Sequence, residues 1–321
     1  MGDRTPDVIL PNGFRLPAEL SRRLARGGRA ASWMATVPAI VRDWCERWEI
    51  TLEPHVPTLS YNLVLFGTSR LHGQVVLKVA PPDPETRAEI EATAVARGPG
   101  LVRLIGADPD AAIMLLKRVQ PGTPLRQLTE SGAISDEEAT RLAARMMSRV
   151  WATPPPQHHL VPLARWFQAL FAYRHAHPDG NGPLPPAIVD RAVAEARTLL
   201  ATQDSPVVLH GDVHHDNLLA DEVDGWTLID FKGLVGERGY DVGTWMLNPP
   251  GLESWPDLAD RLARRLEILA AELRLPQHRL WQWSLAHAVL SACWSLEDGD
   301  GSALPALRVA ETIVRLEPGD D

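Results

Sequence analysis

The hydrophobic and polar positions in the first third of the chain follow the pattern of short strands. Two apolar, β-branched runs, LSYNLVLFGT and GQVVLKVA, are separated by SRLH and predict a β-hairpin. LVRLIGAD and AIMLLKRV predict two more strands, the second ending in the turn signal QPGTP. Between the two pairs, Asp83 suits an N-cap and Pro84 a first turn, for a helix that ends at Gly98. We therefore expect a small antiparallel sheet with one inserted helix up to about residue 117.

Helical periodicity dominates the rest of the chain. Apolar residues recur at helical spacing over 17–26, 38–48, 135–151, 162–175 and 186–202. The first two segments begin with a proline, which suits the first turn of a helix, and Ser135 with Glu138 forms a capping-box pattern. The helical half is interrupted once, by the short strands VVL, NLLA and WTLID around polar loops. We therefore expect a mainly helical C-terminal half with a few strands inserted into it.

Length and composition indicate a soluble protein with two lobes. A chain of 321 residues exceeds what one hydrophobic core usually serves. No run reaches the roughly 18 apolar residues of a membrane span, and the N-terminus lacks the basic and apolar regions of a signal peptide, so we expect a cytoplasmic location. The net charge of −9 disfavours nucleic acid and anionic membranes as partners. Cys45 and Cys293 lie in apolar, tryptophan-containing stretches, and we expect both to be reduced residues of buried helices.

The residues best suited to chemistry gather where the helical half is interrupted. In HGDVHHDN, Asp212 precedes Asn217 by five positions, and Asp230 closes the strand WTLID thirteen residues later. Phosphoryl transfer needs a carboxylate that orients and deprotonates the attacking hydroxyl, and oxygen ligands that hold magnesium against the nucleotide phosphates. A loop between two short strands lets metal-binding side chains converge from opposite arms of a hairpin. The spacing therefore favours a magnesium-dependent phosphotransferase.

Two other interpretations of the same run stay open. Its polar residues are compatible with a solvated turn whose aspartates cap backbone amides. The run also contains potential zinc ligands, namely His210, Asp212, His214, His215 and Asp216. The binuclear zinc hydrolases, however, have histidine at the place of Asp212 and aspartate at the place of His214. Stoichiometric zinc in the purified protein would favour the zinc-site interpretation.

A second candidate cluster lies in the predicted sheet and its helix. Lys78 ends the strand QVVLKVA, where a lysine can reach nucleotide phosphates if a carboxylate holds its ammonium group. Glu89 and Glu91 compete for that role, but two helical residues so spaced face opposite sides. Glu91 shares a stripe with Ala88, so we predict Glu91 as the partner. The alternative is that Lys78 and Glu91 are unrelated surface charges.

The chain resembles the streptomycin 6-kinase branch of the aminoglycoside phosphotransferases, which includes proteins described as hydroxyurea phosphotransferases. The resemblance is carried by LKVAPPDPETRAEIEATAV, MLLKRVQPG, VVLHGDVHHDNLLA and WTLIDFKGLVGERGYDVGTWMLNPP. It spans nearly the whole chain, and IDFKGLVGERGYDVG is its most branch-specific part. The resemblance implies an α+β, protein-kinase-like bilobal fold. Its small N-terminal lobe, with an antiparallel sheet plus helices, would comprise 1–117, and its larger, mainly helical lobe 118–321, with the nucleotide between them.

The same resemblance implies roles for the candidate residues. Asp212 would be the catalytic base, and Asn217 and Asp230 would bind Mg²⁺. Lys78 would contact the phosphates of ATP, with Glu91 as its ion-pair partner. These are the residues that we expect to form the catalytic and nucleotide-binding site.

Further roles concern the hinge and the support of the catalytic loop. The hinge beside adenine would consist of Leu116, Lys117, Arg118 and Val119. Asp241 in RGYDVG resembles the buried aspartate that braces the catalytic loop through backbone hydrogen bonds. His210 is expected to pack and to form hydrogen bonds rather than to catalyse.

The implied activity is transfer of the γ-phosphoryl group of ATP to a hydroxyl of a small cationic acceptor, with streptomycin as the acceptor that the branch suggests. Carboxylates near the cleft should bind its guanidinium or ammonium groups, and the candidates are Glu237, Glu297 and Asp298. Trp294 would flank the acceptor or pack in the core. Alternatives are another hydroxylated metabolite or hydroxyurea as acceptor, or a catalytically silent kinase-like binding module.

Overall fold

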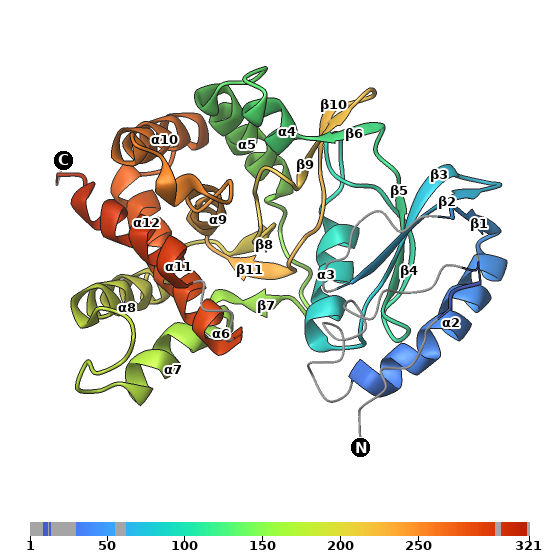
Figure 1. Cartoon of the computed structure of the whole chain (residues 1–321), viewed down its shortest axis with the longest axis horizontal. Helices are drawn as coiled ribbons and strands as arrows, with labels where there is room; N and C mark the ends of the chain where they lie inside the picture. The colour runs from blue at the N-terminus through green and yellow to red at the C-terminus, as the bar shows by residue number, and fades with distance from the viewer. Residues whose placement is uncertain (1–8, 12, 14–29, 55–61, 299–302, 320–321) are drawn as a thin grey trace.

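The computed structural model describes residues 9–11, 13, 30–54, 62–298 and 303–319, so the helix predicted over 17–26 lies outside the described residues. A five-stranded antiparallel sheet forms one side of the molecule, in the order β1-β2-β3-β5-β4 (Figure 1). Its strands are β1 (Ile50–Leu52), β2 (Leu63–Ser69), β3 (Gly73–Val79), β4 (Leu104–Asp108) and β5 (Ile113–Lys117). The predicted hairpin is β2 with β3, in the register Leu63↔Val79 to Ser69↔Gly73.

Two of the described helices, α2 (Ala30–Arg47) and α3 (Pro84–Val95), accompany this sheet. α2 contains Pro38 in its interior, so the proline does not begin the helix as predicted. The apolar face of α2 is buried against the sheet, and this packing outweighs the local cost of the proline. α3 begins as predicted, because Asp83 accepts the amide hydrogen of Thr86 at 2.7 Å.

The other side of the molecule is mainly helical (Figure 1). Its helices are α4 (Leu125–Glu130), α5 (Asp136–Val150), α6 (Leu163–Trp166), α7 (Gln168–Ala176), α8 (Pro186–Ala201), α9 (Val242–Met246), α10 (Leu258–Leu273), α11 (Gln277–Asp298) and α12 (Ala303–Arg315), with 3-10 turns η1 (Arg238–Asp241) and η2 (Leu252–Ser254). Ser135 and Glu138 form the predicted capping box of α5. The helix predicted over 162–175 is two helices, α6 and α7, which meet at the fully buried Phe167.

Two small sheets lie within the helical side and position the loops of the site. One has the order β10-β9-β6, with β6 (Pro121–Pro124), β9 (Leu218–Asp221) and β10 (Gly225–Leu228). The other has the order β7-β11-β8, with β7 (Val161–Pro162), β8 (Val207–Leu209) and β11 (Leu234–Gly236). The strands VVL, NLLA and WTLID were predicted and correspond to β8, β9 and β10, whereas β6, β7 and β11 were not predicted.

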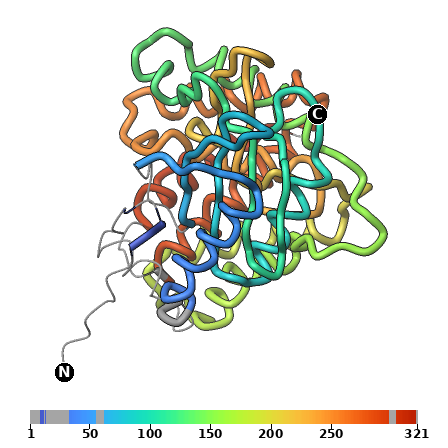
Figure 2. Tube along the Cα trace, turned by 90° about the vertical axis from the view of Figure 1, so that its right-hand side faces the viewer, coloured from blue at the N-terminus to red at the C-terminus, as the bar shows by residue number. Residues whose placement is uncertain are grey.

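Two separate hydrophobic clusters underlie the two sides. The smaller joins α2 to the five-stranded sheet, and the larger fills the helical side and extends to the alanine face of α3. Figure 2 shows the N-terminal segments in front of the C-terminal helices, in agreement with a bilobal arrangement. The chain therefore has the predicted α+β architecture.

The two cysteines lie on helices, as predicted. Cys45 on α2 is partly buried and Cys293 on α11 is buried, and both are free. Burial raises the pKa of both thiols, to about 11 and about 12 respectively, so neither is a thiolate at neutral pH. Within the described part of the chain, no helix is both long and apolar enough to span a membrane.

Candidate active site

The loop after β8 carries the predicted base, and Asp241 fixes the backbone of that loop. The Asp241 carboxylate accepts the amide hydrogens of Gly211 at 2.8 Å and of His210 at 3.3 Å, and the indole hydrogen of Trp151 at 2.9 Å. Gly211 has φ +78°, and a Cβ there would lie 2.7 Å from the Leu234 side chain, so only glycine fits. Burial raises the pKa of Asp241 to about 6, although its hydrogen-bond donors oppose the shift. The structure thus contains the backbone hydrogen bonds predicted for Asp241.

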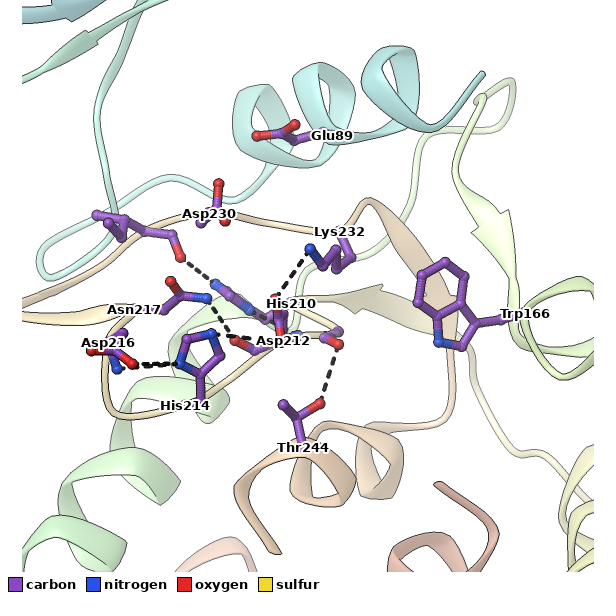
Figure 3. Close-up of polar contacts among 12 residues, drawn as sticks. Glu89, Trp166, His210, Asp212, His214, Asp216, Asn217, Asp230, Lys232 and Thr244 are labelled. Atoms are coloured by element: carbon purple, nitrogen blue, oxygen red, sulfur yellow. Dashed lines mark hydrogen bonds and ion pairs between the residues drawn. The ribbon is translucent and has the colours of Figure 1, made fainter. Parts of the chain in front are cut away.

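Asp212 lies beside other polar side chains of this loop and the next (Figure 3). Its Oδ2 atom lies 3.2 Å from Lys232 Nζ, and its Oδ1 atom lies 3.8 Å from His214 Nε2. Asn217 donates a hydrogen bond from Nδ2 to the main-chain oxygen of Asp212 at 2.9 Å. The Oδ1 atom of Asn217 makes no hydrogen bond to a described residue, so it is available as an oxygen ligand.

Asp230 follows β10 and contacts the lysine of the opposite lobe. Its carboxylate forms an ion pair with Lys78 Nζ, and its side chain is 40% exposed. The partial loss of water around the carboxylate would by itself raise the pKa of Asp230, but the charges of Lys78 and Lys232 lower it to about 2. Asp230 is therefore anionic at neutral pH. Together with Asn217 it offers the oxygen donors that Mg²⁺ prefers, in the small number that leaves room for phosphates and water.

Lys78 pairs with Glu89 and not with Glu91, so the sequence-based choice between the two glutamates was wrong. The Lys78 ammonium contacts the Glu89 carboxylate, and both side chains are buried. Glu91 Oε2 instead accepts the amide hydrogen of His159 at 2.7 Å. The prediction assumed one buried face on α3, whereas the Ala88 face packs into the larger core and the Glu89 face turns to the sheet. Because Glu91 shares the stripe of Ala88, it points to the helical side.

The histidines of the loop are committed to packing and hydrogen bonds. His210 Nε2 contacts the Ile229 oxygen at 2.8 Å, and its Nδ1 accepts the amide hydrogen of Asp212 at 3.1 Å. The His215 ring stacks on Trp245 with the centroids 4.2 Å apart. Burial lowers the pKa of His210 to about 4 and that of His215 to about 2. His210 is thus a packing residue. Among the described residues, no three histidine, cysteine, aspartate or glutamate side chains are grouped so that they could hold a metal ion, which argues against the zinc-site alternative.

The predicted hinge lies at the end of β5, and much of it is bound to the sheet. The amide of Lys117 donates to the Arg103 oxygen at 2.9 Å, and the amide of Arg118 donates to the Gln74 oxygen at 3.2 Å. Leu116 belongs to the ladder with β3. Because these residues are bonded to the sheet, Val119 is the hinge residue whose amide is a candidate for a contact with adenine.

A cleft of about 560 Å³ opens beside Asp212 on the helical side. Its polar and aromatic lining residues are Trp166, Asp212, His214, Asp216, Lys232, Thr244, Asn248, Glu253, His287, Ser291, Trp294 and Ser295. Trp166 and Trp294 meet edge to face with their ring centroids 5.0 Å apart. Asp216 pairs with Arg126 at 2.8 Å, whereas Glu253 forms no ion pair with any described residue. The cleft thus combines an aromatic corner with a carboxylate that forms no ion pair within the described part of the chain.

Of the three carboxylates predicted to bind the acceptor, the two whose side chains are described, Glu237 and Glu297, do not line this cleft. Glu237 is held in an ion pair with Arg279 and accepts the indole hydrogen of Trp283 at 3.2 Å, which makes it a structural residue. Glu297 is exposed near the end of α11 and is not among the lining residues. Asp298 ends α11, and its side chain lies outside the described residues. Trp294, for which we considered a place beside the acceptor or in the core, does line the cleft.

The sequence reasoning missed several cleft residues, among them Lys232, Trp166 and Glu253. Lys232 stands two positions after Asp230, and its cationic side chain so close to a predicted metal ligand was a usable signal. Trp166 on α6 and Glu253 on η2 had no local signal, because only the contact of α6 with α11 and the packing of η2 against α12 bring them to the cleft.

The chain matches the family model "Aminoglycoside/hydroxyurea antibiotic resistance kinase" over residues 47–299. It belongs to this family. The chain is similar to the streptomycin 6-kinase of Streptomyces griseus, with 29% identity over 96% of this chain and 98% of that protein. The streptomycin 3''-kinase of Klebsiella pneumoniae is 33% identical over 79% of this chain and 91% of that protein.

Solved structures show that the fold is the kinase-like one. A thermostable mutant of the aminoglycoside phosphotransferase APH(4)-Ia superposes with a TM-score of 0.58 at 17% identity, over 87% of this chain and 99% of that chain. The choline kinase LicA from Streptococcus pneumoniae gives a TM-score of 0.57 at 10% identity, over 88% of this chain and 99% of that chain. The family member described here therefore has the predicted kinase-like bilobal α+β fold.

Proposed function

We propose that the protein transfers the γ-phosphoryl group of ATP to a hydroxyl of a small, polar, cationic acceptor, and that streptomycin is the leading acceptor. The observation that carries the proposal is the position of Asp212 at the cleft, with Asn217 and Asp230 on one side and the aromatic corner of Trp166 and Trp294 on the other. Family membership and the names of the relatives support the same reaction class.

Each candidate side chain has a definite task in this reaction. Asp212 would accept the proton of the attacking hydroxyl, and Lys78, held by Glu89, would contact the nucleotide phosphates in the lobe interface, with the lobes divided near Lys117. Asn217 and Asp230 would hold Mg²⁺, which bridges phosphate oxygens and offsets their charge.

The cleft also supports a choice between the acceptor classes. Glu253, unpaired among the described residues, suits a guanidinium or ammonium group, and the two indole rings suit an apolar or cationic ring face. A volume of about 560 Å³ is typical of sites for multi-ring ligands. Hydroxyurea, the other acceptor class of the family description, would fill only a small part of it. Streptomycin therefore takes precedence, with hydroxyurea as the second candidate.

The test is ADP release with ATP and Mg²⁺ over a panel of streptomycin, other aminoglycosides and hydroxyurea, with product mass measured by mass spectrometry. Streptomycin should give ADP release and gain one phosphoryl group. Asp212→Asn should lower turnover by about 10²- to 10⁴-fold and leave nucleotide affinity unchanged. Asp260→Asn, on the exposed face of α10, is the matched control. Wild-type turnover in Asp212→Asn, or no phosphorylated product from any acceptor, would refute the proposal.

A further inference from the structure

We propose that Lys232 is a second phosphate-binding cation, which contacts the transferring phosphoryl group between nucleotide and acceptor. The inference rests on the phosphotransferase function proposed above and assigns a catalytic residue to that reaction. It starts from one observation about the cleft. Among the described residues that line it, Lys232 is the one lysine or arginine. Its Nζ atom lies 3.2 Å from the carboxylate of Asp212, the predicted base.

The position of Lys232 is fixed by its main chain. Its amide donates to the His210 oxygen at 2.8 Å, which ties it to the loop of the base. The next residue, Gly233, has φ +70°, and a Cβ there would lie 2.3 Å from the main-chain carbon of Ala88 on α3. The segment is therefore clamped between the catalytic loop and the helix of the other lobe. A cation held in this way needs little reorganisation when charge develops beside it.

The charges across the site alternate in sign. Glu89 pairs with Lys78, and Lys78 pairs with Asp230. Lys232 pairs with Asp212 at 3.2 Å, the contact marked in Figure 3. Asp230 and Lys232 stand two residues apart and stabilise each other electrostatically. A phosphoryl group that passes from the side of Asp230 to the side of Asp212 must approach two carboxylates. Lys232 lies where its ammonium would offset that repulsion.

The transfer step defines what the ammonium would contact. The acceptor oxygen forms a bond to the γ-phosphorus while the bond from phosphorus to the β–γ bridging oxygen breaks, and ADP leaves with that electron pair. The hydroxyl proton goes to Asp212. Negative charge is spread over the three equatorial oxygens of the transferring group throughout, and Lys232 would donate hydrogen bonds to one of them.

The two lysines of the site differ in their surroundings, which indicates a division of labour. The Lys78 side chain is 6% exposed and is held by two carboxylates, so it suits phosphates bound inside the lobe interface. The Lys232 side chain is 43% exposed at the cleft and is held by one carboxylate. A cationic acceptor would be repelled by an ammonium group, so acceptor binding is a poor explanation for Lys232.

The first experiment measures ATP and ADP affinity with Mg²⁺ by isothermal titration calorimetry in the absence of acceptor. A contact with the terminal phosphate predicts that Lys232→Met weakens ATP binding by about 10- to 100-fold and changes ADP binding by less than about twofold. Lys232→Arg, which keeps the charge, should restore most of the preference for ATP. Glu272→Gln changes an exposed residue of α10 and serves as the control, with ATP and ADP affinities expected to equal those of the wild type.

A second experiment needs no variant, because the chain has three lysines, Lys78, Lys117 and Lys232. An ATP derivative that carries an acyl group on its terminal phosphate transfers that group to a nearby amine, with release of the nucleotide. Peptide mass spectrometry should find Lys232 acylated, and excess ATP should block the reaction. Lys117, whose Nζ donates to the His72 oxygen at 2.9 Å on the exposed side of the sheet, reports non-specific acylation.

The outcomes separate this inference from the proposed function. If wild-type protein phosphorylates an acceptor but Lys232→Met loses affinity for ATP and ADP equally, or for neither, the phosphate contact is wrong. The same holds if Lys232→Met lowers only turnover, because Lys232 would then act through the orientation of Asp212. Absence of ATP-protected acylation of Lys232 would also overturn it. Failure of the wild-type protein to phosphorylate any acceptor would instead count against the proposed function.

Discussion

Asp241 accepts the amide hydrogen of Gly211 at 2.8 Å, and this bond joins η1 to the loop that carries Asp212. The two residues are 30 positions apart in the sequence. The carboxylate is fully buried and lies among three donors, two of which belong to the catalytic loop. The direction in which Asp212 points therefore depends on a residue that itself has no contact with the cleft.

The first prediction concerns this support. Asp241→Asn places an NH₂ group against amide donors, so we expect the free energy of unfolding to fall by about 1–3 kcal/mol and kcat to fall about 10²-fold. ATP affinity should change little, because Lys78 and Asp230 are untouched. Urea denaturation, steady-state kinetics and calorimetry test these expectations, with Asp260→Asn as control. A kcat equal to that of the wild type would show that the brace does not position Asp212.

The second prediction tests the corrected ion pair. Glu89→Gln removes the carboxylate that holds Lys78, and we expect the affinity for ATP to fall by about tenfold or more. Glu91→Gln changes a glutamate of the same helix whose contact is with His159, and it should leave ATP affinity within about twofold of wild type. Calorimetric titration of both variants compares them directly. Equal losses in the two variants would contradict the assignment.

The third prediction concerns the acceptor. Glu253→Gln removes the carboxylate that is unpaired among the described residues of the cleft, so KM for a cationic acceptor should rise by about 10- to 100-fold. KM for ATP should stay unchanged, and Glu272→Gln on α10 is the control. Initial rates with each substrate varied in turn separate the two constants. An unchanged KM for the acceptor would remove Glu253 from the site.

The fourth prediction concerns pH and His287 on α11. This buried ring lies 3.0 Å from the Tyr240 hydroxyl and 3.4 Å from Thr244 Oγ1, and burial lowers its pKa to about 4. An unfolded histidine has a pKa of about 6.5, so the unfolded chain binds this proton first as the pH falls. The stabilising contribution is present above about pH 6.5 and is lost as the pH falls toward about 4.

His287→Gln should reduce the pH dependence of the free energy of unfolding in this range by up to about 1.4 kcal/mol per pH unit. The measurement is urea denaturation from about pH 7, above the unfolded pKa of about 6.5, down to about pH 4.5, which is still above the folded pKa of about 4. His175→Gln, which changes an exposed histidine of α7, should retain the wild-type dependence. If both variants have the wild-type slope, His287 is not protonated on unfolding in this interval.

Local sequence signals were sufficient to predict structure wherever the stabilising contacts join residues close in sequence. Asp83 capping α3, the box of Ser135 and Glu138 on α5, and the hairpin of β2 and β3 depend on residues close in sequence. The site run HGDVHHDN is similarly local, since Asn217 binds the main chain of Asp212 five residues before it. The sequence alone thus predicted β2 to β5 and β8 to β10, several of the helices, and Asp212, Asn217 and Asp230 as candidates, whereas β1, β6, β7 and β11 were not predicted.

Tertiary structure decided everything that depends on an element having more than one packed face. α3 packs on both the sheet and the helical side. The spacing of its apolar residues therefore could not predict that Glu89 faces Lys78 while Glu91 faces the helical side. The packing of η2 brings Glu253 to the cleft. Glu237 does not reach the cleft, because its ion pair with Arg279 holds it elsewhere. Periodicity reports which residues share a face, but only the packed fold determines what that face meets.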